Sequence, residues 1–507
     1  MTDSTPSPKP SDRSLHRHML HGSIWMILLR WAIRLIGLVS TIILARLLVP
    51  SDFGIVAMAM FVVGLLELLS QSGQKLTIIR HAAPTREDYD TAWTVSVIVG
   101  IFIATAIVAL APLARIYFHE PRVVPVIYWL ALRSILGGLE NIGAVDFRRE
   151  LQFDRFFIYN MCPKLVSFVV TIALAFVWRN YWALVAGMVT QQLAMNVLSY
   201  TMHPYRPRFS MAKIREILSF SVWTLIRTIG NYLNSQIDLL AVGGMLGASA
   251  MGRYTVAADV ASSPSRELVE PMGAVLYPVM SKVRSDPVAL RGLYLRAFGW
   301  TAVICFSASI GVTMVAHDLV HLVLGAKWFD LEPLMGWLAL AAGLLGLSGG
   351  AYAAFDAIGK PHLGARMQWV RVSMLVLVLA PVALLLKSII AIAVVRVAVT
   401  AIFIPTLFFA VGREMNITPG DYLAAMWRPA AAAGAMASAI YWSNALMPPG
   451  IVRLLFDVLL GVATFSSISI FFWKITGSPS GPEQDVLAAV AGVIRRVRAQ
   501  NPAPGPK

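Results

Sequence analysis

Two stripes of polar residues lie on stretches of the chain that are otherwise apolar. Within each stripe the residues recur at spacings of four, three and four, which places them on one face of a helix. The first stripe consists of Arg227, Asn231, Asn234 and Asp238, and the second of Asp259, Ser263, Arg266 and Glu270. Arg30 and Arg34 form a shorter stripe of the same kind. Because guanidinium groups stay charged and bind phosphate oxygens in pairs, these residues favour the binding of an anion.

The helices that carry these stripes are expected to cross a membrane. Hydrophobic residues make up 57% of the 507-residue chain, only 14% of it is charged, and the mean hydropathy is +0.69. A soluble protein carries about a quarter charged residues, since its surface faces water. Apolar runs of about 20 residues recur, each long enough as a helix to span the hydrocarbon core. This composition excludes soluble enzymes, collagens, disordered chains and disulfide scaffolds.

The apolar runs predict an all-α membrane protein with about 14 transmembrane helices. With both termini in the cytoplasm, the inner segments hold most of the 42 Lys and Arg residues, as the positive-inside rule requires. The formal net charge of +15 then needs no nucleic-acid partner. Cys162 and Cys305 provide neither a disulfide framework nor a four-ligand metal site. No nucleotide-binding or catalytic motif occurs, so neither a cofactor nor an enzymatic activity is expected.

Two pairs of segments repeat at an offset of about 200 residues. Ala45–Gly54 aligns with Gly243–Gly252, and Pro125–Leu132 aligns with Pro333–Leu340. Each segment of the first pair joins the first two spans of a half, and the second of them is expected to hold a short outer loop at residues 243–249. An offset that covers six spans predicts two six-helix bundles, related by a pseudo-two-fold axis along the membrane normal, and two further helices. The chain is thus expected to divide into a cytoplasmic N-terminal tail, two bundles, two additional transmembrane helices and a cytoplasmic C-terminal tail: 1–22, 23–202, 203–412, 413–475 and 476–507. The C-terminal tail is expected to be solvated and to carry an interfacial helix on anionic lipid, with a helix that docks on a partner as the alternative.

Charged residues inside the membrane locate the expected site. Each costs about 2.5–3.5 kcal/mol near the bilayer centre, so a group of them implies a wet or paired environment. In the predicted orientation Arg30, Arg227 and Arg266 lie in the cytoplasmic half of the membrane, with Arg34 near its middle. We therefore expect a basic cavity that opens to the cytoplasm and binds a phosphate-bearing substrate. The candidate substrate-binding residues are Arg30, Arg34, Arg227, Asn231, Asn234 and Arg266.

An alternative is that each arginine only neutralises a nearby acid and thereby closes a bundle. Arg266, for example, could pair with a glutamate one or four residues further on. For Arg133 and Glu140, seven residues apart on one helical face, we favour this structural interpretation. Arg396 is also expected to be structural, because it stands alone in its span.

Asp238, Asp259 and Glu270 are the candidate ion-coupling residues. A carboxylate in a partly dry cavity can titrate or bind a cation during alternating access, so the coupling ion would be H⁺ or Na⁺. The alternative for Asp238 is a structural role, hydrogen-bonded beside Asn234 or Gln236.

His317 and His321 stand four residues apart at the outer end of a span. This spacing occurs in zinc-binding helices, but no glutamate lies between the two histidines. We expect interfacial histidines and no metal, with metal binding as the alternative.

Four segments resemble the bacterial polysaccharide transporter family, which includes O-antigen and exopolysaccharide flippases. They are Ile42–Ala57, Asn231–Asp238, Leu246–Ala257 and Glu270–Pro278, and the resemblance extends over residues 23–475. This family is part of the multidrug/oligosaccharidyl-lipid/polysaccharide exporter superfamily.

The resemblance implies a flippase that moves undecaprenyl-diphosphate-linked oligosaccharide from the cytoplasmic to the periplasmic leaflet by alternating access. The resemblance also implies that the protein lies among the lipids of the bacterial inner membrane and acts in surface polysaccharide or exopolysaccharide biosynthesis. Polysaccharide polymerase and export proteins are possible partners. Arg30, Arg34, Arg227 and Arg266 are the positions that could bind the diphosphate and sugar.

Two other functions fit the same sequence features. A cation-coupled multidrug exporter could have this architecture, although four arginines in its cavity would repel cationic drugs. A non-transporting membrane scaffold for polysaccharide assembly would need no polar cavity at all.

Overall fold

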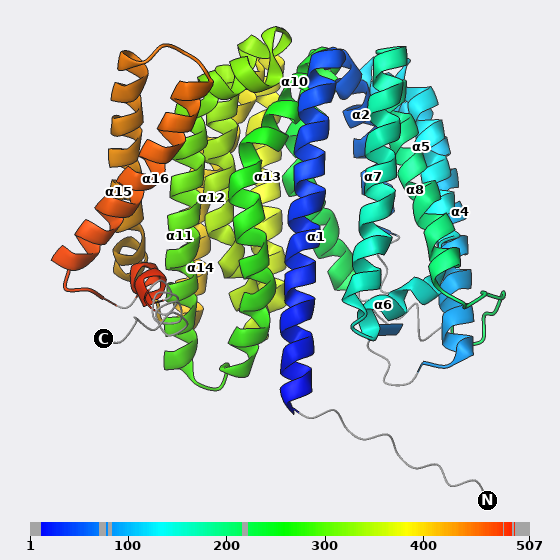
Figure 1. Ribbon diagram of the computed structural model, residues 1–507, viewed down its shortest axis with the longest axis horizontal. Helices are drawn as coiled ribbons and strands as arrows, with labels where there is room; N and C mark the ends of the chain where they lie inside the picture. Colours follow the sequence, from blue (N-terminus) through cyan, green and yellow to red (C-terminus); the bar gives the residue numbers. More distant parts are fainter. Residues whose placement is uncertain are drawn as a thin grey trace, which may run out of the picture. The chain divides into compact units, whose positions relative to one another are not determined.

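A computed structural model of the chain describes residues 12–69, 78–79, 84–214, 222–479, 481–488 and 491 (Figure 1). For residues 12–24, 222–225, 227 and 274 the structure describes the backbone but not the side chain. The described residues form helices and turns and contain no strand. They divide into two compact units. Unit 1 comprises Met1–Tyr232 and Gly247–Gly252, and unit 2 comprises Leu233–Leu246 and Arg253–Lys507.

Unit 1 is a bundle of long helices. Its elements are α1 (Asp12–Leu47), α2 (Pro50–Glu67), α4 (Arg86–Phe118), α5 (Val123–Gly138), a 3₁₀ turn (Ile142–Val145), α6 (Asp146–Arg149), α7 (Phe153–Trp178) and α8 (Trp182–Met202). Helix α4 packs along α5, α7 along α1 and α8, and α2 against α4 and α5. The chain bends after α5, where the Asn141 side chain accepts a hydrogen bond from the Gly143 backbone N–H at 2.9 Å and caps the 3₁₀ turn.

Unit 2 holds most of α10 and all later elements. They are α10 (Val222–Lys282), α11 (Pro287–Asp318), a π-helix (Leu319–Leu324), a 3₁₀ turn (Ala326–Leu331), α12 (Glu332–Ala357), α13 (Pro361–Leu386), α14 (Ile389–Met415), α15 (Pro419–Leu446) and α16 (Ile451–Ile475). Helix α11 packs against α12 and α15, and α15 lies along α16 (Figure 1). In the core, the rings of Phe408 and Tyr422 stack at 4.5 Å between centroids. The C-terminal helices therefore contribute to the core of unit 2.

The described helices account for part of the predicted membrane spans. Nine of them are long and apolar enough to cross a membrane, or ten if the bent pair Val123–Gly138 and Ile142–Arg149 forms one span. Helices α8, α10 and α15 also coincide with predicted spans but do not meet this criterion. Helix α10 carries both polar stripes, which lower its hydropathy. The all-helical membrane class is confirmed, and the number 14 stays a prediction.

Helix α10 contains a break where the sequence predicts a short outer loop at residues 243–249. Two helical segments meet at a single residue, Gly247, with φ +84°. A side chain rarely adopts this left-handed conformation, whereas glycine adopts it freely. The predicted loop is therefore wrong in length, because one glycine suffices to redirect the chain.

The segment after this break packs against the start of α2 inside unit 1. A Cβ added to Gly54 would lie 1.7 Å from the Ala248 backbone oxygen, and one added to Gly252 would lie 1.8 Å from the Pro50 backbone oxygen. In the repeat found in the sequence, Gly54 aligns with Gly252 and Pro50 with Ala248. The two contacts are thus reciprocal, as contacts across a two-fold axis are. Both glycines are needed for this backbone approach.

Candidate functional site

Helix α1 carries two of the predicted substrate-binding arginines. Arg30 and Arg34 are both partly exposed. The next residues in the chain, Trp31 and Leu35, are exposed apolar residues on an adjacent face of α1, and that face suits lipid. The side chain of Arg227 lies outside those that the structure describes.

Unit 1 contains a cavity of about 780 Å³ between α1, α2, α4, α5, α7 and α8. Its polar lining combines charged groups with hydroxyls and amides: Ser40, Glu67, Ser96, Arg133, Ser134, Glu140, Lys164, Ser167, Thr171, Gln191 and Gln192. Hydroxyls and amides donate and accept hydrogen bonds, and Arg and Lys bind phosphate oxygens. The cavity can therefore hold a polyhydroxylated or phosphorylated group. The charged residues of the lining come from different helices, and on α7 Lys164, Ser167 and Thr171 recur at spacings of three and four, a pattern that could have pointed to the cavity.

Two charged residues of this cavity have other partners than expected. Arg133 Nη2 lies 3.9 Å from Glu67 Oε2 on α2. Glu140 Oε1 accepts a hydrogen bond from the Tyr159 hydroxyl at 2.5 Å. The expected structural pair between Arg133 and Glu140 is therefore wrong, because each finds its partner on another helix. Both side chains remain part of the cavity lining.

Asp238 lies in a buried ion pair. It is 3% exposed, its Oδ2 lies 2.5 Å from Arg396 Nη1, and it accepts a hydrogen bond from the Tyr254 hydroxyl at 2.5 Å. Asn234 is also buried, whereas Asn231 is exposed. The expectation that Arg396 stands alone is wrong, because its partner comes from α10. Asp238 thus has structural partners, as the alternative for this residue proposed. The partners are Arg396 and Tyr254 in place of the neighbouring amides.

A second buried guanidinium belongs to the same region of unit 2. Arg371 on α13 is 0% exposed, donates to Thr400 Oγ1 at 3.0 Å and lies 5.9 Å from the Phe403 ring centroid. Thr400 in turn donates to the backbone oxygen of Arg396 at 2.7 Å. The sequence suggests that Arg371, near the start of its span, belongs with the adjacent inner loop. The structure buries it instead, next to the helix that carries Arg396.

The second stripe of α10 is more accessible than the first. Asp259 is partly buried, and Arg266 and Glu270 are exposed. Arg266 donates a hydrogen bond to Ser262 Oγ on its own helix. Among the described residues no carboxylate pairs with Arg266, so the alternative in which Glu267 or Glu270 neutralises it is wrong. The Arg266 guanidinium is available to a ligand.

The described part of the C-terminal tail lies against unit 2. Asp485 accepts a hydrogen bond from Arg296 Nε at 2.9 Å, and Glu483 Oε1 lies 3.2 Å from Arg428 Nη1. The hydrogen bond from Arg296 holds the pKa of Asp485 below its ordinary value. Within residues 481–488, Glu483 and Asp485 thus contact unit 2 in place of solvent, and the interfacial helix on anionic lipid stays a prediction. Most of the remaining tail lies outside the described residues.

Two solved membrane transporters share the fold of this chain. The lipid II flippase MurJ in an inward closed conformation superimposes with a TM-score of 0.72 at 12% identity, over 90% of this chain and 99% of that one. An inward-facing multidrug transporter of the MATE family gives 0.58 at 15% identity, over 78% and 99%. At these identities the similarity establishes the fold alone. The fold is that of a multi-pass membrane transporter.

Sequence comparison defines the family more closely. The chain matches the family described as polysaccharide biosynthesis protein over residues 43–333, which is more than half of its length, and it belongs to that family. It is 26% identical over 336 residues to the lipopolysaccharide biosynthesis protein WzxC of Escherichia coli K12, covering 66% of this chain and 68% of WzxC. It is 24% identical over 327 residues to the succinoglycan biosynthesis transport protein ExoT of Rhizobium meliloti 1021, covering 63% and 65%. The chain therefore belongs to a polysaccharide biosynthesis family, is similar to proteins named for polysaccharide biosynthesis and transport, and has the fold of a membrane transporter.

Proposed function

We propose that the chain flips undecaprenyl-diphosphate-linked oligosaccharide from the cytoplasmic to the periplasmic leaflet of the bacterial inner membrane. Two bundles with both chain termini in the cytoplasm would expose the substrate alternately to the two sides. A diphosphate in bare hydrocarbon would cost tens of kcal/mol in lost hydration, so a polar path must carry the head group while the lipid tail stays in the bilayer.

The polar cavity of unit 1 carries this proposal. Its volume of about 780 Å³ lies in the range of small-molecule sites, which is roughly 300–1,000 Å³. Gln191, Gln192 and the cavity serines suit sugar hydroxyls, and Arg133 and Lys164 suit phosphate. A cationic drug would instead favour an acidic, aromatic lining.

The candidate residues on α1 and α10 are part of the same proposal. Arg30 and Arg34 are partly exposed, and Arg266 is exposed and faces no carboxylate among the described residues. We assign them, with Arg227, to the diphosphate. The amides of Asn231 and Asn234 would bind sugar hydroxyls.

Ion coupling is proposed for the three acidic residues of α10. Asp259 and Glu270 are the more accessible carboxylates, so H⁺ or Na⁺ could reach them without a change in the core of unit 2. Asp238 would take part only if its ion pair with Arg396 opened during the transport cycle.

The test is a leaflet-translocation assay with fluorescent lipid-linked oligosaccharide and the protein reconstituted in liposomes. Replacing Arg30, Arg34, Arg227 or Arg266 by Gln removes charge-assisted hydrogen bonds worth about 1.5–3 kcal/mol. Each variant should therefore lower the translocation rate by at least about tenfold. The corresponding Arg→Lys variants should be milder, because the charge remains.

A matched control is Arg284→Gln, an exposed arginine in the loop between α10 and α11, which should translocate at the wild-type rate. Normal translocation by all four Gln variants at wild-type protein levels would contradict the assignment. A scaffold would translocate nothing in liposomes, and a drug exporter would move a cationic dye in place of the lipid-linked sugar.

A further inference from the structure

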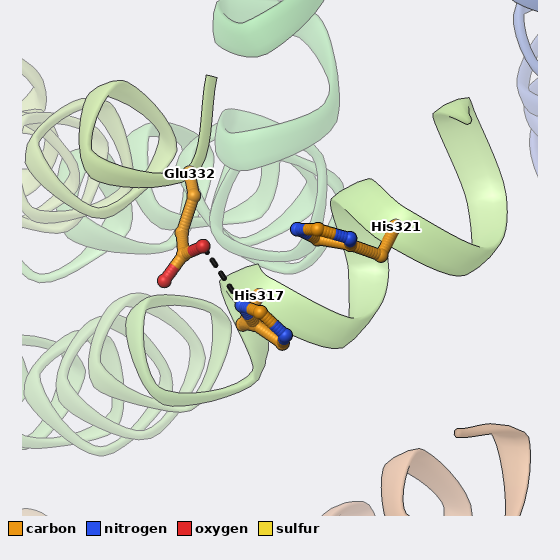
Figure 2. Close-up of side chains that lie close together, drawn as sticks. All are labelled: His317, His321 and Glu332. Carbon is orange, nitrogen blue, oxygen red and sulfur yellow. Dashed lines mark hydrogen bonds and ion pairs between the residues drawn. The ribbon is translucent and has the colours of Figure 1, made fainter. Parts of the chain in front are cut away.

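Two histidines and a glutamate converge at the junction of α11 and α12. His317 lies in the last turn of α11, His321 lies in the π-helix, and Glu332 is the first residue of α12. One nitrogen or oxygen of each side chain lies within 4.8 Å of the others, and His317 Nδ1 lies 2.8 Å from Glu332 Oε2. Figure 2 shows a ring nitrogen of His321 pointing toward the His317–Glu332 pair. The sequence shows the two histidines, but it does not reveal the glutamate, which comes from the next helix.

The backbone and two aromatic contacts hold the His321 ring in place. The Gly325 N–H donates to the Val320 carbonyl at 3.0 Å, a five-residue step of the π-helix. Such π-helical turns are rare and often occur at functional sites. The His321 ring stacks on His317 at 4.3 Å and on Phe329 at 3.7 Å between ring centroids. These contacts place the His321 ring beside His317, next to the His317–Glu332 pair.

We propose that His317, His321 and Glu332 bind one divalent transition-metal ion of the zinc type. Two imidazoles and one carboxylate are a known zinc ligand set, and water completes the four-coordinate shell. Zinc–ligand distances of about 2.0–2.2 Å require the three ligand atoms to approach one another to about 3.3 Å, which side-chain rotation can provide. All three residues are partly exposed, so an ion can enter from solvent.

The neighbouring carboxylates are already engaged. Asp318 Oδ2 accepts a hydrogen bond from Arg453 Nε at 2.6 Å, with a second from Nη2 to Oδ1 at 2.7 Å. Asp330 forms an ion pair with Arg253. Glu332 is therefore the carboxylate left for a metal at this junction, and the site has three protein ligands.

A bound ion would join the last turn of α11 to the first turn of α12. The two residues that it would link, His317 and Glu332, are separated by the π-helix and the 3₁₀ turn. In the predicted topology this junction faces the periplasm, so the ion would come from outside the cytoplasm. The site involves none of the residues assigned to substrate, and its test is independent of transport.

The experiment is equilibrium dialysis of the purified full chain against Zn²⁺ alone, with the metal content measured by atomic emission. The protein should be purified through an affinity tag that contains no histidine. Wild type should bind one Zn²⁺ per chain, and His321→Gln should bind at least about tenfold more weakly. Substitution with Co²⁺ should give the visible absorption bands of a four-coordinate site.

Glu332→Gln, which keeps the size of the side chain, gives a second reading if His321→Gln does not fold. His362→Gln, at an exposed histidine near the start of α13, is the matched control. A triple variant, His16→Gln with His18→Gln and His21→Gln, controls for the N-terminal histidines. Both controls should bind Zn²⁺ as wild type does. Failure of wild type to bind Zn²⁺ in the micromolar range, or equally tight binding by the ligand variants, would overturn the proposal.

Discussion

At the scale of single residues, Asp238 and Arg396 form a buried ion pair in unit 2. Both side chains are almost fully buried, and Tyr254 donates a further hydrogen bond to the carboxylate. Removing one member of a buried pair leaves the other charge without compensation, which costs about 3–5 kcal/mol. Removing both members is much less costly, because no buried charge is left unpaired.

We therefore expect Asp238→Asn and Arg396→Met each to lower the free energy of unfolding by about 3–5 kcal/mol. The double variant should be more stable than the sum of the single effects implies. Denaturant unfolding of the purified protein in detergent would measure the double-mutant cycle. Strictly additive effects would show that the two residues do not interact in the folded protein.

At the scale of elements, the crossing of α2 and the second segment of α10 depends on two glycines. Gly54→Ala would place a methyl group 1.7 Å from the Ala248 backbone oxygen, so one backbone must move. We expect a loss of about 1–3 kcal/mol in unfolding free energy, as for other overpacked sites. Gly252→Ala should behave alike, because its contact is reciprocal. Thermal unfolding in detergent would measure both.

Gly37→Ala in α1 is the matched control for this prediction. A Cβ at Gly37 meets nothing within 4 Å, and alanine favours the helix, so stability should be unchanged or slightly higher. If Gly54→Ala melted at the wild-type temperature, the close approach of the two backbones would be refuted.

The contact between the C-terminal segment and α11 should weaken in acid. The pKa of Asp485 is lowered in the folded protein, mainly by the hydrogen bond from Arg296. Because the pKa of the Asp485 carboxyl is lower in the docked state, the ionised carboxylate stabilises docking at pH values above the ordinary pKa of 3.8. This stabilisation is lost as the pH falls through the lowered pKa. We therefore expect the segment to stay docked at neutral pH and to detach below about pH 4.

A fluorescent label on the cysteine of a Leu487→Cys variant would report this release. Trp300, which donates a hydrogen bond to Asp485 at 3.1 Å, should quench the label while the segment is docked, so release should raise the fluorescence. Cys162→Ser removes the more accessible native thiol. Asp485→Asn should release the segment at neutral pH and abolish the acid transition. An unchanged transition in that variant would assign the pH dependence to another group.

At the scale of the whole molecule, the charge distribution predicts both termini in the cytoplasm. Two cysteine variants test this orientation. Pro448→Cys changes the turn between α15 and α16, which is predicted to lie outside, and Arg284→Cys changes the turn between α10 and α11, which is predicted to lie inside. A membrane-impermeant maleimide added to spheroplasts should label Pro448→Cys and not Arg284→Cys, in a Cys162→Ser background. Labelling of Arg284→Cys alone would invert the topology and, with it, the predicted direction of substrate loading.

The sequence by itself determined the helical membrane class, the stripes of α10, the repeat that brings Gly54 and Gly252 into register, and the family. These features depend on hydropathy, on helical periodicity and on short matches along the chain, which are local properties. Only the tertiary structure decided the partners: Arg396 for Asp238, Glu332 for the two histidines, and Arg296 for Asp485. A side chain pairs with whichever helix packs against its face, and helical period fixes the face but not the neighbour. The cavity of unit 1 needed the structure for the same reason, since its lining is spread over many helices.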